Sequence, residues 1–530
     1  MQRRNAWKPV VALLGAIILV LPVLVVPAAA APSPSRLDDE LSQRLQTTPE
    51  AGLIPVIVEG AADAAPGAQL SARAKRAEDR VRDSGGRVVA SSNLLGATVA
   101  ELTPAQVRAL AGDPSVGRIH FDAPVSAAWA SADPSTGGPT PVVFQQTVGA
   151  PDAWQAGDTG QGVTVAVLDT GIDDNAAAFG GRIKARIDLV DPAHPARGDP
   201  AGHGTHVAGI IAAGRMFPSP GIAPDASLVS VRVLDPNGHS RVSTIILGLE
   251  WVVAHKSSLG IRVVVMALGA PALAGYRDDP LASAAELAWR SGLVIVAAAG
   301  NDGPGAGTIQ TPGIDPLVLT VGASDDAGTP SPADDVLPTW SSVGPTPDGL
   351  AKPDLVAPGR KIVSVRVPGS TIDLLSPTHV EGPTTIRFSG TSEAAGVAAG
   401  AAALLMQQRP ELTPDQTKAL LTHAARPITS ASPAAQGAGL LNVTRSMAER
   451  TPHVSRPHLP PASGLIRAVL PEIAGQIANG EVAGDTVLWD KVLWDQVLWD
   501  KVLWDKVLWD QVLWDKVLWD KVLWDQTIFD

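Results

Sequence analysis

The chain has 530 residues, which is long enough for several domains and for at least one full hydrophobic core. Its formal net charge of -12 at pH 7 argues against nucleic acid as the main partner. Cysteine is absent, which excludes disulfides, zinc–thiolate sites and a cysteine nucleophile.

The N-terminus has the pattern of an export signal. Basic residues precede an apolar run over residues 10–26, and alanines over 28–31 offer a small-residue cleavage site. We therefore expect a signal peptide over residues 1–31 and a secreted protein. The alternative is an uncleaved anchor that retains the protein at the cell surface, because a run of 17 residues is borderline for spanning a bilayer.

Residues 32–128 are expected to form a small α+β module. Strands are predicted at 54–58, in two pieces within 87–102 and at 116–121, with helices at 69–83 and 104–112. The order β-α-β-β-α-β is the ferredoxin-like arrangement. Nothing in it indicates catalysis, and His120 is predicted to be structural. Such a module could be an inhibitor, a chaperone or a simple binding unit.

Between residues 142 and 445, short apolar strands alternate with Ala-rich helices. Strands are predicted at 163–168, 227–234, 263–268, 293–298 and 318–321. Helices are predicted at 203–213, 242–255, 279–291, 392–408 and 414–424. This alternation predicts an α/β fold with a doubly wound, mainly parallel sheet. Sites in such sheets lie beyond the carboxyl ends of the strands.

An internal repeat follows a predicted linker over residues 446–486. Val-Leu-Trp-Asp-Lys/Gln occurs eight times over residues 487–526 and carries eight of the fourteen tryptophans. A five-residue step turns a helix by about 140°, and an odd period places successive tryptophans on opposite faces of a strand. Neither gives one apolar face. The sequence leaves open a small solenoid, self-association, adhesion to membrane or cell envelope, and an expanded low-complexity tail.

Ser392 stands in Ser-Gly-Thr-Ser-Glu-Ala-Ala-Gly, at the start of a helix that is apolar on every side. Unpaired backbone N–H groups and the helix dipole favour developing negative charge there, which suits a nucleophile. Taken alone, Gly-Thr-Ser at a helix start is more often an N-cap.

Asp169 ends a predicted apolar strand, where a buried carboxylate is costly unless it is bonded. Asp-Thr-Gly is also the aspartic-protease signature, a rival reading that requires two such motifs to face each other. Asn301 follows another strand end. Asparagine there is usually a turn former, and its functional role would be a side-chain N–H directed at an oxyanion.

His203 lies between two glycines at the start of a predicted helix, and His206 follows three residues later. A metal pair is one interpretation of this spacing. No Glu accompanies the pair in a metalloprotease pattern, so His206 is predicted to be a packed or capping residue. Together with Asp169, Asn301 and Ser392, His203 completes a set of groups that fits acyl transfer by an activated serine.

The segments 165–173, 203–209, 297–301 and 390–392 resemble the four signature segments of the subtilisin-like serine peptidases. The resemblance implies that Ser392 is the nucleophile, His203 the base and acid, Asp169 the residue that orients it, and Asn301 an oxyanion-hole donor. It also implies a substrate cleft along two extended segments. Their residues are Ala267, Leu268 and Gly269 in one, and Ala297, Ala298 and Gly300 in the other.

The resemblance further implies that residues 32–128 are an inhibitory propeptide, removed by self-cleavage near Ala127–Trp129. The partners would be protein or peptide substrates and the propeptide itself, with no cofactor and no metal. The segment 213–223 lacks the Asn-rich calcium loop of many bacterial members.

Two departures from the family pattern bear on activity. Ala267 replaces the usual serine, and Glu393 replaces the usual methionine after the nucleophile. We expect Glu393 to place a carboxylate beside the developing oxyanion and to weaken or specialise the activity. The alternative function is a catalytically weak or idle surface protein that binds through its Trp-rich repeats.

Overall fold

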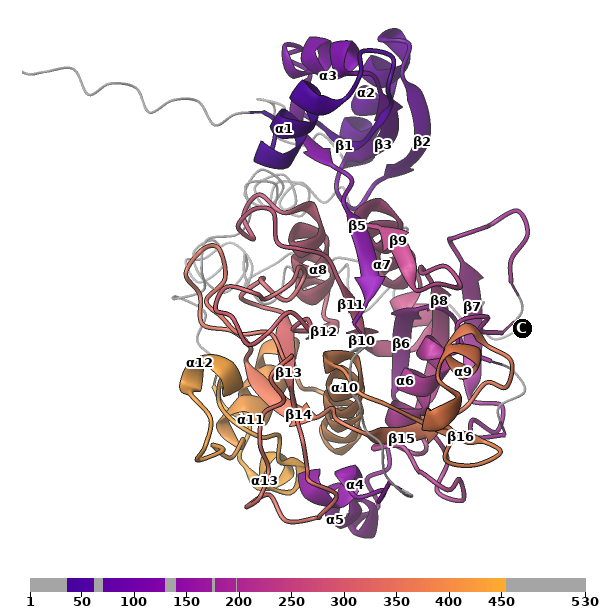
Figure 1. Cartoon of the computed structure of the whole chain (residues 1–530), viewed down its shortest axis with the longest axis vertical. Helices are drawn as coiled ribbons and strands as arrows, with labels where there is room; N and C mark the ends of the chain where they lie inside the picture. The colour runs from indigo at the N-terminus through magenta and orange to yellow at the C-terminus, as the bar shows by residue number, and fades with distance from the viewer. Residues whose placement is uncertain (1–35, 62–69, 129–139, 174–176, 197, 454–530) are drawn as a thin grey trace, which may run out of the picture. The chain divides into compact units, whose positions relative to one another are not determined.

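The computed structural model in Figure 1 describes residues 36–61, 70–128, 140–173, 177–196 and 198–453. The expected signal peptide, the repeats and most of the predicted linker lie outside these residues. No helix within the described ranges is long and apolar enough to span a membrane.

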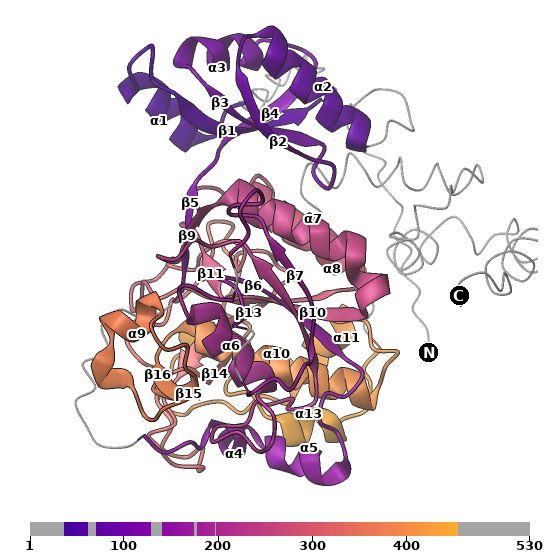
Figure 2. The same cartoon turned by 90° about the vertical axis from the view of Figure 1, so that its right-hand side faces the viewer.

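The N-terminal module has the predicted order of strands and helices, preceded by one helix that was not predicted. Its elements are α1 (Asp39–Thr47), β1 (Ile54–Gly60), α2 (Leu70–Asp83), β2 (Arg87–Ser92), β3 (Ala97–Leu102), α3 (Pro104–Ala111) and β4 (Val116–Phe121). The four strands pair antiparallel in the order β2-β3-β1-β4, which confirms the ferredoxin-like arrangement. Helices α2 and α3 lie on the same side of this sheet (Figure 2).

Local sequence explains where the helices of the module begin and which face they bury. The Thr103 hydroxyl accepts from the Gln106 N–H while the Gln106 side chain accepts from the Thr103 N–H, a capping box that starts α3. Val107 and Leu110, three residues apart, are buried against the sheet.

The larger unit is built on a seven-stranded parallel sheet. Its strands are β6 (Thr164–Asp169), β7 (Ile183–Asp188), β8 (Ser227–Arg232), β10 (Ile261–Met266), β12 (Val294–Ala298), β13 (Leu319–Ser324) and β14 (Leu355–Pro358). Their order is β14-β13-β12-β10-β6-β8-β7, which confirms the doubly wound α/β fold. The five predicted strands are all present. The two edge strands, β7 and β14, were not predicted.

Helices and short strands complete this unit. The helices are α4 (Phe144–Val148), α5 (Ala150–Ala156), α6 (His203–Ala212), α7 (Val242–Leu259), α8 (Pro280–Arg290), α9 (Thr371–Leu375), α10 (Thr391–Gln408), α11 (Pro414–His423), α12 (Pro433–Gln436) and α13 (Val443–Ala448), with a 3-10 turn at Pro377–His379. The short strands are β5 (Pro124–Ala127), β9 (His239–Arg241), β11 (Leu268–Gly269), β15 (Ile362–Val365) and β16 (Thr385–Phe388).

Helix α10 runs through the hydrophobic core, as its composition predicts. Every residue from Thr391 to Met406 is buried. Small Ala and Gly side chains allow strands β10, β12 and β13 to pack against it. The helix therefore carries Ser392 on a rigid, fully packed element.

Candidate active site

The sequence-predicted groups meet at the carboxyl edge of the sheet. Asp169 is the last residue of β6, Ala267 follows β10, and Asn301 follows β12. His203 is the first residue of α6 and Ser392 the second residue of α10. Parallel strands bring their carboxyl ends to one edge, which is where helix N-termini also point.

Asp169 and His203 form a buried, hydrogen-bonded pair. His203 Nδ1 lies 2.7 Å from Asp169 Oδ1, and the two residues are 1% and 0% exposed. Burial disfavours the imidazolium. The charge and hydrogen bond of Asp169 are the largest effects that oppose this, and the pKa of His203 is raised. The ring is thus oriented by a carboxylate that also stabilises its protonated form.

Asp199, which sequence reasoning missed, organises the start of α6. Its carboxylate accepts hydrogen bonds from the N–H groups of Gly202 and Thr205 and from the hydroxyls of Thr170 and Thr205. Burial nevertheless raises the pKa of Asp199. An Asp four residues before His203 is a capping signal that could have been noticed.

The glycine after His203 is required by close approach of the backbone. A Cβ on Gly204 would lie 2.2 Å from the carbonyl oxygen of Gly171 and 3.0 Å from Asp169 Cβ. The Gly204 N–H instead donates to the Thr170 hydroxyl at 2.9 Å. Glycine therefore lets α6 start directly against the end of β6.

The Ser392 hydroxyl is fully buried and donates to the carbonyl oxygen of Ala267 at 2.9 Å. The same carbonyl accepts the Ala128 N–H at 3.1 Å. In this structure the Ser392 hydroxyl is therefore hydrogen-bonded to the Ala267 carbonyl oxygen.

Asn301 holds the carbonyl oxygen of Ala128. Asn301 Nδ2 donates to that oxygen at 2.5 Å, and the Ser392 N–H donates to it at 3.4 Å. Asn301 Oδ1 accepts from the backbone N–H and the hydroxyl of Thr391, both at 3.0 Å, which fixes the orientation of the amide. Two donors that converge on one carbonyl oxygen are the geometry of an oxyanion hole.

An extended segment of the chain itself, β5, leads directly to Ala128. Strand β5 pairs antiparallel with β11, matching Ala127 with Leu268 and Ser126 with Gly269, and pairs with β9 on its other side. Val125 and Ala128 are buried, whereas Pro124 and Ser126 are exposed. Of the substrate-cleft residues expected from sequence, Leu268 and Gly269 therefore contact residues just before Ala128.

The second expected cleft segment lies beside the first. Ala297 and Ala298 end β12, and the Gly300 N–H donates to the Thr391 hydroxyl at 3.1 Å. Gly300 has φ +106°, and a Cβ there would lie 2.7 Å from the Gln310 side chain. Glycine is therefore required between β12 and Asn301.

His206 and Glu393 face each other away from these contacts. Both are fully buried, with His206 Nδ1 3.4 Å from Glu393 Oε1. His206 packs edge-on against Phe388, which confirms it as a packed residue. The Glu393 carboxylate was expected beside the oxyanion site. Instead it faces the His206 ring and bonds no oxyanion-site group among the described residues.

The aspartic-protease reading is wrong on geometric grounds. A second Asp-Thr-Gly occurs at residues 158–160, but the N–H groups of Thr159 and Gly160 donate to Gln407 at the far end of α10. An 18-residue helix is about 27 Å long, and Asp169 lies near its other end. The two motifs do not face each other.

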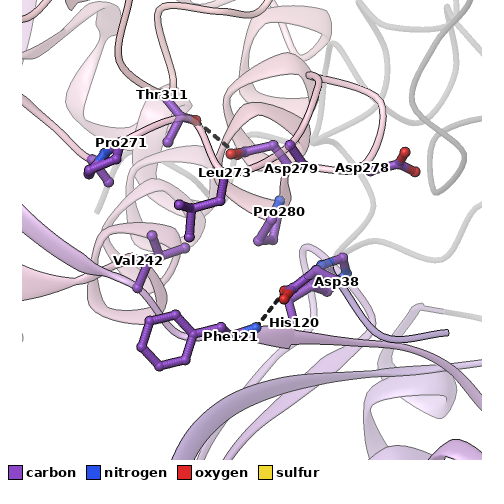
Figure 3. Close-up of a pocket in the computed structure, with 13 residues that line it drawn as sticks. Asp38, His120, Phe121, Val242, Pro271, Leu273, Asp278, Asp279, Pro280 and Thr311 are labelled. Atoms are coloured by element: carbon purple, nitrogen blue, oxygen red, sulfur yellow. Dashed lines mark hydrogen bonds and ion pairs between the residues drawn. The ribbon is translucent and has the colours of Figure 1, made fainter. Parts of the chain in front are cut away.

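The described residues show one further pocket, lined by residues of the module and of the larger unit (Figure 3). Asp38 accepts from the Phe121 N–H at 2.7 Å on one side, and Thr311 donates to Asp279 at 2.8 Å on the other. None of Asp169, His203, Asn301 and Ser392 lines it. Within the described ranges, no group of three or more His, Cys, Asp and Glu side chains is placed to hold a metal ion.

Comparison with known proteins gives consistent relatives. Residues 160–444 match the model of the subtilase family, Peptidase_S8. Serine protease AprX of Bacillus subtilis (strain 168) is 38% identical over 364 residues, covering 67% of this chain and 80% of the relative. An alkaline protease of Alkalihalobacillus alcalophilus is 35% identical, covering 64% and 77%.

A solved structure is also similar. It is fervidolysin from Fervidobacterium pennivorans, described as a keratinolytic enzyme related to subtilisin, with a TM-score of 0.58 at 21% identity. The match covers 76% of this chain, which spans 62% of that chain. At this identity the likeness supports the fold.

Proposed function

The chain belongs to the subtilase family and is a subtilisin-like serine endopeptidase, and from this premise we propose that Ser392, His203 and Asp169 are its triad. The observation that carries the proposal is the Ala128 carbonyl, bound by Asn301 and the Ser392 N–H where a substrate carbonyl would sit.

The steps follow from these positions. Ser392 Oγ turns from Ala267 and attacks the carbonyl carbon, while His203 Nε2 takes its proton. Negative charge moves onto the carbonyl oxygen, where Asn301 and the Ser392 N–H stabilise it. The C–N bond then breaks, and His203 gives the proton to the leaving amine. Water hydrolyses the acyl-enzyme by the same steps in reverse, and Asp169 stabilises the imidazolium throughout.

The first substrate of the site is the chain itself. Strand β5, which ends one residue before Ala128, pairs antiparallel with β11, as a bound peptide would in the proposed cleft. We therefore place self-cleavage between Ala128 and Trp129, which frees residues 32–128 as a propeptide that first inhibits the enzyme. The export signal expected at residues 1–31 makes the mature enzyme a secreted one.

Expression of the full chain and of its Ser392→Ala variant tests this function. The native chain is expected to yield a mature form that begins at Trp129 and reacts with a fluorophosphonate, read by N-terminal sequencing and mass spectrometry. The Ser392→Ala variant should accumulate uncut and unlabelled. Removal of residues up to 128 in that variant would refute self-cleavage. Failure of the native chain to label at any pH would support a catalytically idle surface protein.

A further inference from the structure

Glu393 and His206 form a buried pair next to the proposed triad, and neither takes part in the steps proposed above. Glu393 follows Ser392 on α10, and His206 lies one turn after His203 on α6. Both side chains are fully buried, and His206 Nδ1 lies 3.4 Å from Glu393 Oε1. Buried charges are costly unless they are compensated, so the charge of this pair has to be explained.

Hydrogen-bond chemistry gives the number of protons in the pair. His206 Nε2 lies 3.2 Å from the carbonyl oxygen of Ile386, which can only accept, so Nε2 carries a proton. Nδ1 faces a carboxylate oxygen, and two bare acceptors would repel each other. One further proton therefore lies on either Nδ1 or Oε1. In both arrangements the pair is neutral overall.

The two helices touch closely where the pair bridges them. A Cβ on Gly396 would lie 3.2 Å from Ile210 of α6, so a larger residue there would press on Ile210. Glu393 lies in the first turn of α10, where the helix dipole favours a negative charge. The Ser364 hydroxyl donates to the His206 carbonyl oxygen at 2.9 Å and ties this turn of α6 to β15.

We propose that Glu393 and His206 share one proton in a neutral pair that fixes the start of α10 against the first turn of α6. Both are positioning residues, since neither touches the substrate strand, and they act by holding Ser392 and His203 in register. The proposal rests on the triad roles proposed above. It assigns Glu393 a structural partner in place of an effect on the oxyanion.

The surroundings of His203 make the pair's charge measurable. Carboxylates reach His203 from three elements: Asp169 from β6, Asp199 from the loop before α6, and Glu393 from α10. His206 lies on its own helix. A lone Glu393 carboxylate would favour the His203 imidazolium, whereas a neutral pair has little net effect on it.

Two matched variants separate these cases. Glu393→Gln replaces the carboxylate by an amide that can donate to Nδ1, so a neutral pair stays neutral. His206→Gln keeps a donor for the Ile386 carbonyl, removes the imidazole that faces Glu393 and leaves the buried carboxyl without that partner. The double variant, Glu393→Gln with His206→Gln, removes the carboxyl as well.

The measurement is kcat/KM against pH with a chromogenic peptide, per active site counted by fluorophosphonate labelling. For E393Q we expect the acid limb to stay within about 0.3 pH units of the native enzyme. For H206Q we expect about a tenfold or greater loss of kcat/KM, because the buried Glu393 carboxyl loses the partner that holds the two helices in register. The double variant is expected to recover part of this loss, because no buried carboxyl is then left without a partner.

Two results would overturn the proposal. An acid limb that falls by about one pH unit in E393Q would mean that Glu393 carries an uncompensated charge. An unchanged kcat/KM in H206Q would mean that the pair does not hold Ser392 and His203 in register. If H206Q gives no labelled enzyme, the double variant decides, since recovered labelling supports the pair and continued failure refutes it. Failure of the native enzyme to label would refute the triad, not the pair.

Discussion

Asn301 uses both ends of its side-chain amide. Its amide N–H holds the Ala128 carbonyl oxygen, while its amide oxygen is held by Thr391 at the start of the nucleophile's helix. The donor is thus oriented before any charge develops, which is the condition for effective electrostatic stabilisation.

We predict that Asn301→Ala lowers kcat by about 10²–10³, a barrier increase of about 2.7–4 kcal/mol, with KM nearly unchanged. The reason is that the hydrogen bond donated by the Asn301 amide strengthens most as negative charge forms on the carbonyl oxygen. Steady-state kinetics on a peptide substrate check it, with Thr308→Ala as a control, because the Thr308 hydroxyl bonds Gly305 and Val343 and neither Asn301 nor Thr391. A large rise in KM at constant kcat would contradict the role.

Motifs in the sequence predicted the residues that we propose to react, and missed the contacts that position them. Asp169, His203 and Ser392 stand in short local signatures at strand and helix ends. The contacts of Asp199 with Thr170 and of Glu393 with His206 join segments distant in sequence. Their pairing depends on the packing of whole elements, which no local pattern contains.

At the scale of elements, β5 shows which side chains the cleft accepts. Exposed and buried positions alternate along it, as in an extended strand, up to Ala127, which is half-buried and is followed by the buried Ala128. The buried positions are Ala128, which carries the bound carbonyl, and Val125, three residues before it. The small side chain of Ala128 and the branched apolar side chain of Val125 therefore occupy the two buried positions.

We predict that peptides ending in Val-Ser-Ala-Ala before a chromogenic leaving group are cleaved best. Replacing the last Ala by Phe, or the Val by Asp, should lower kcat/KM by about tenfold or more, because the covered positions fit the smaller or apolar group. Replacing the exposed Ser by Lys is the matched control and should change kcat/KM by less than about threefold. A preference for Phe at the last position would contradict this assignment.

The strands of the parallel sheet were predictable where their sequence is a continuous apolar run. The central strands β6, β8, β10, β12 and β13 are continuous apolar runs and were all predicted. Edge strand β7 alternates half-buried and exposed residues, including Lys184 and Arg186, so it lacks an apolar run. Strand β14 has only four residues and ends in Pro358. Such edges form because a neighbouring strand offers partners, not because of their own composition.

At the scale of the whole molecule, specific hydrogen bonds join the module to the larger unit. Glu250 of α7 accepts from the Ser92 hydroxyl at 2.7 Å and the Asn93 N–H at 3.1 Å. Asp122 accepts from the N–H and hydroxyl of Ser243 in the first turn of α7. In the proposed role of the module as a propeptide, its release would break these contacts and the pairing of β5, and its stability would set how firmly it inhibits.

His120, buried in β4 of the module, links that stability to pH. It contacts Glu59 of β1 at 3.0 Å. Burial lowers its pKa, but the charge and hydrogen bond of Glu59 and the charge of Asp38 outweigh this and raise it above 6.5. Because the folded pKa is raised, this stabilisation is fully present below about pH 6.5 and is lost as the pH rises through the folded value.

We therefore predict that the module of the Ser392→Ala precursor unfolds at a lower temperature as the pH rises from about 6 to 9. His120→Gln keeps a hydrogen-bonding side chain that does not titrate, so its unfolding temperature should change less over this window. Thermal unfolding followed by circular dichroism and limited proteolysis measures both. Equal pH slopes in the two proteins would show that His120 contributes nothing. If the slopes differ as expected, the native chain should release its propeptide faster at alkaline pH, because the same proton that stabilises the module is then lost.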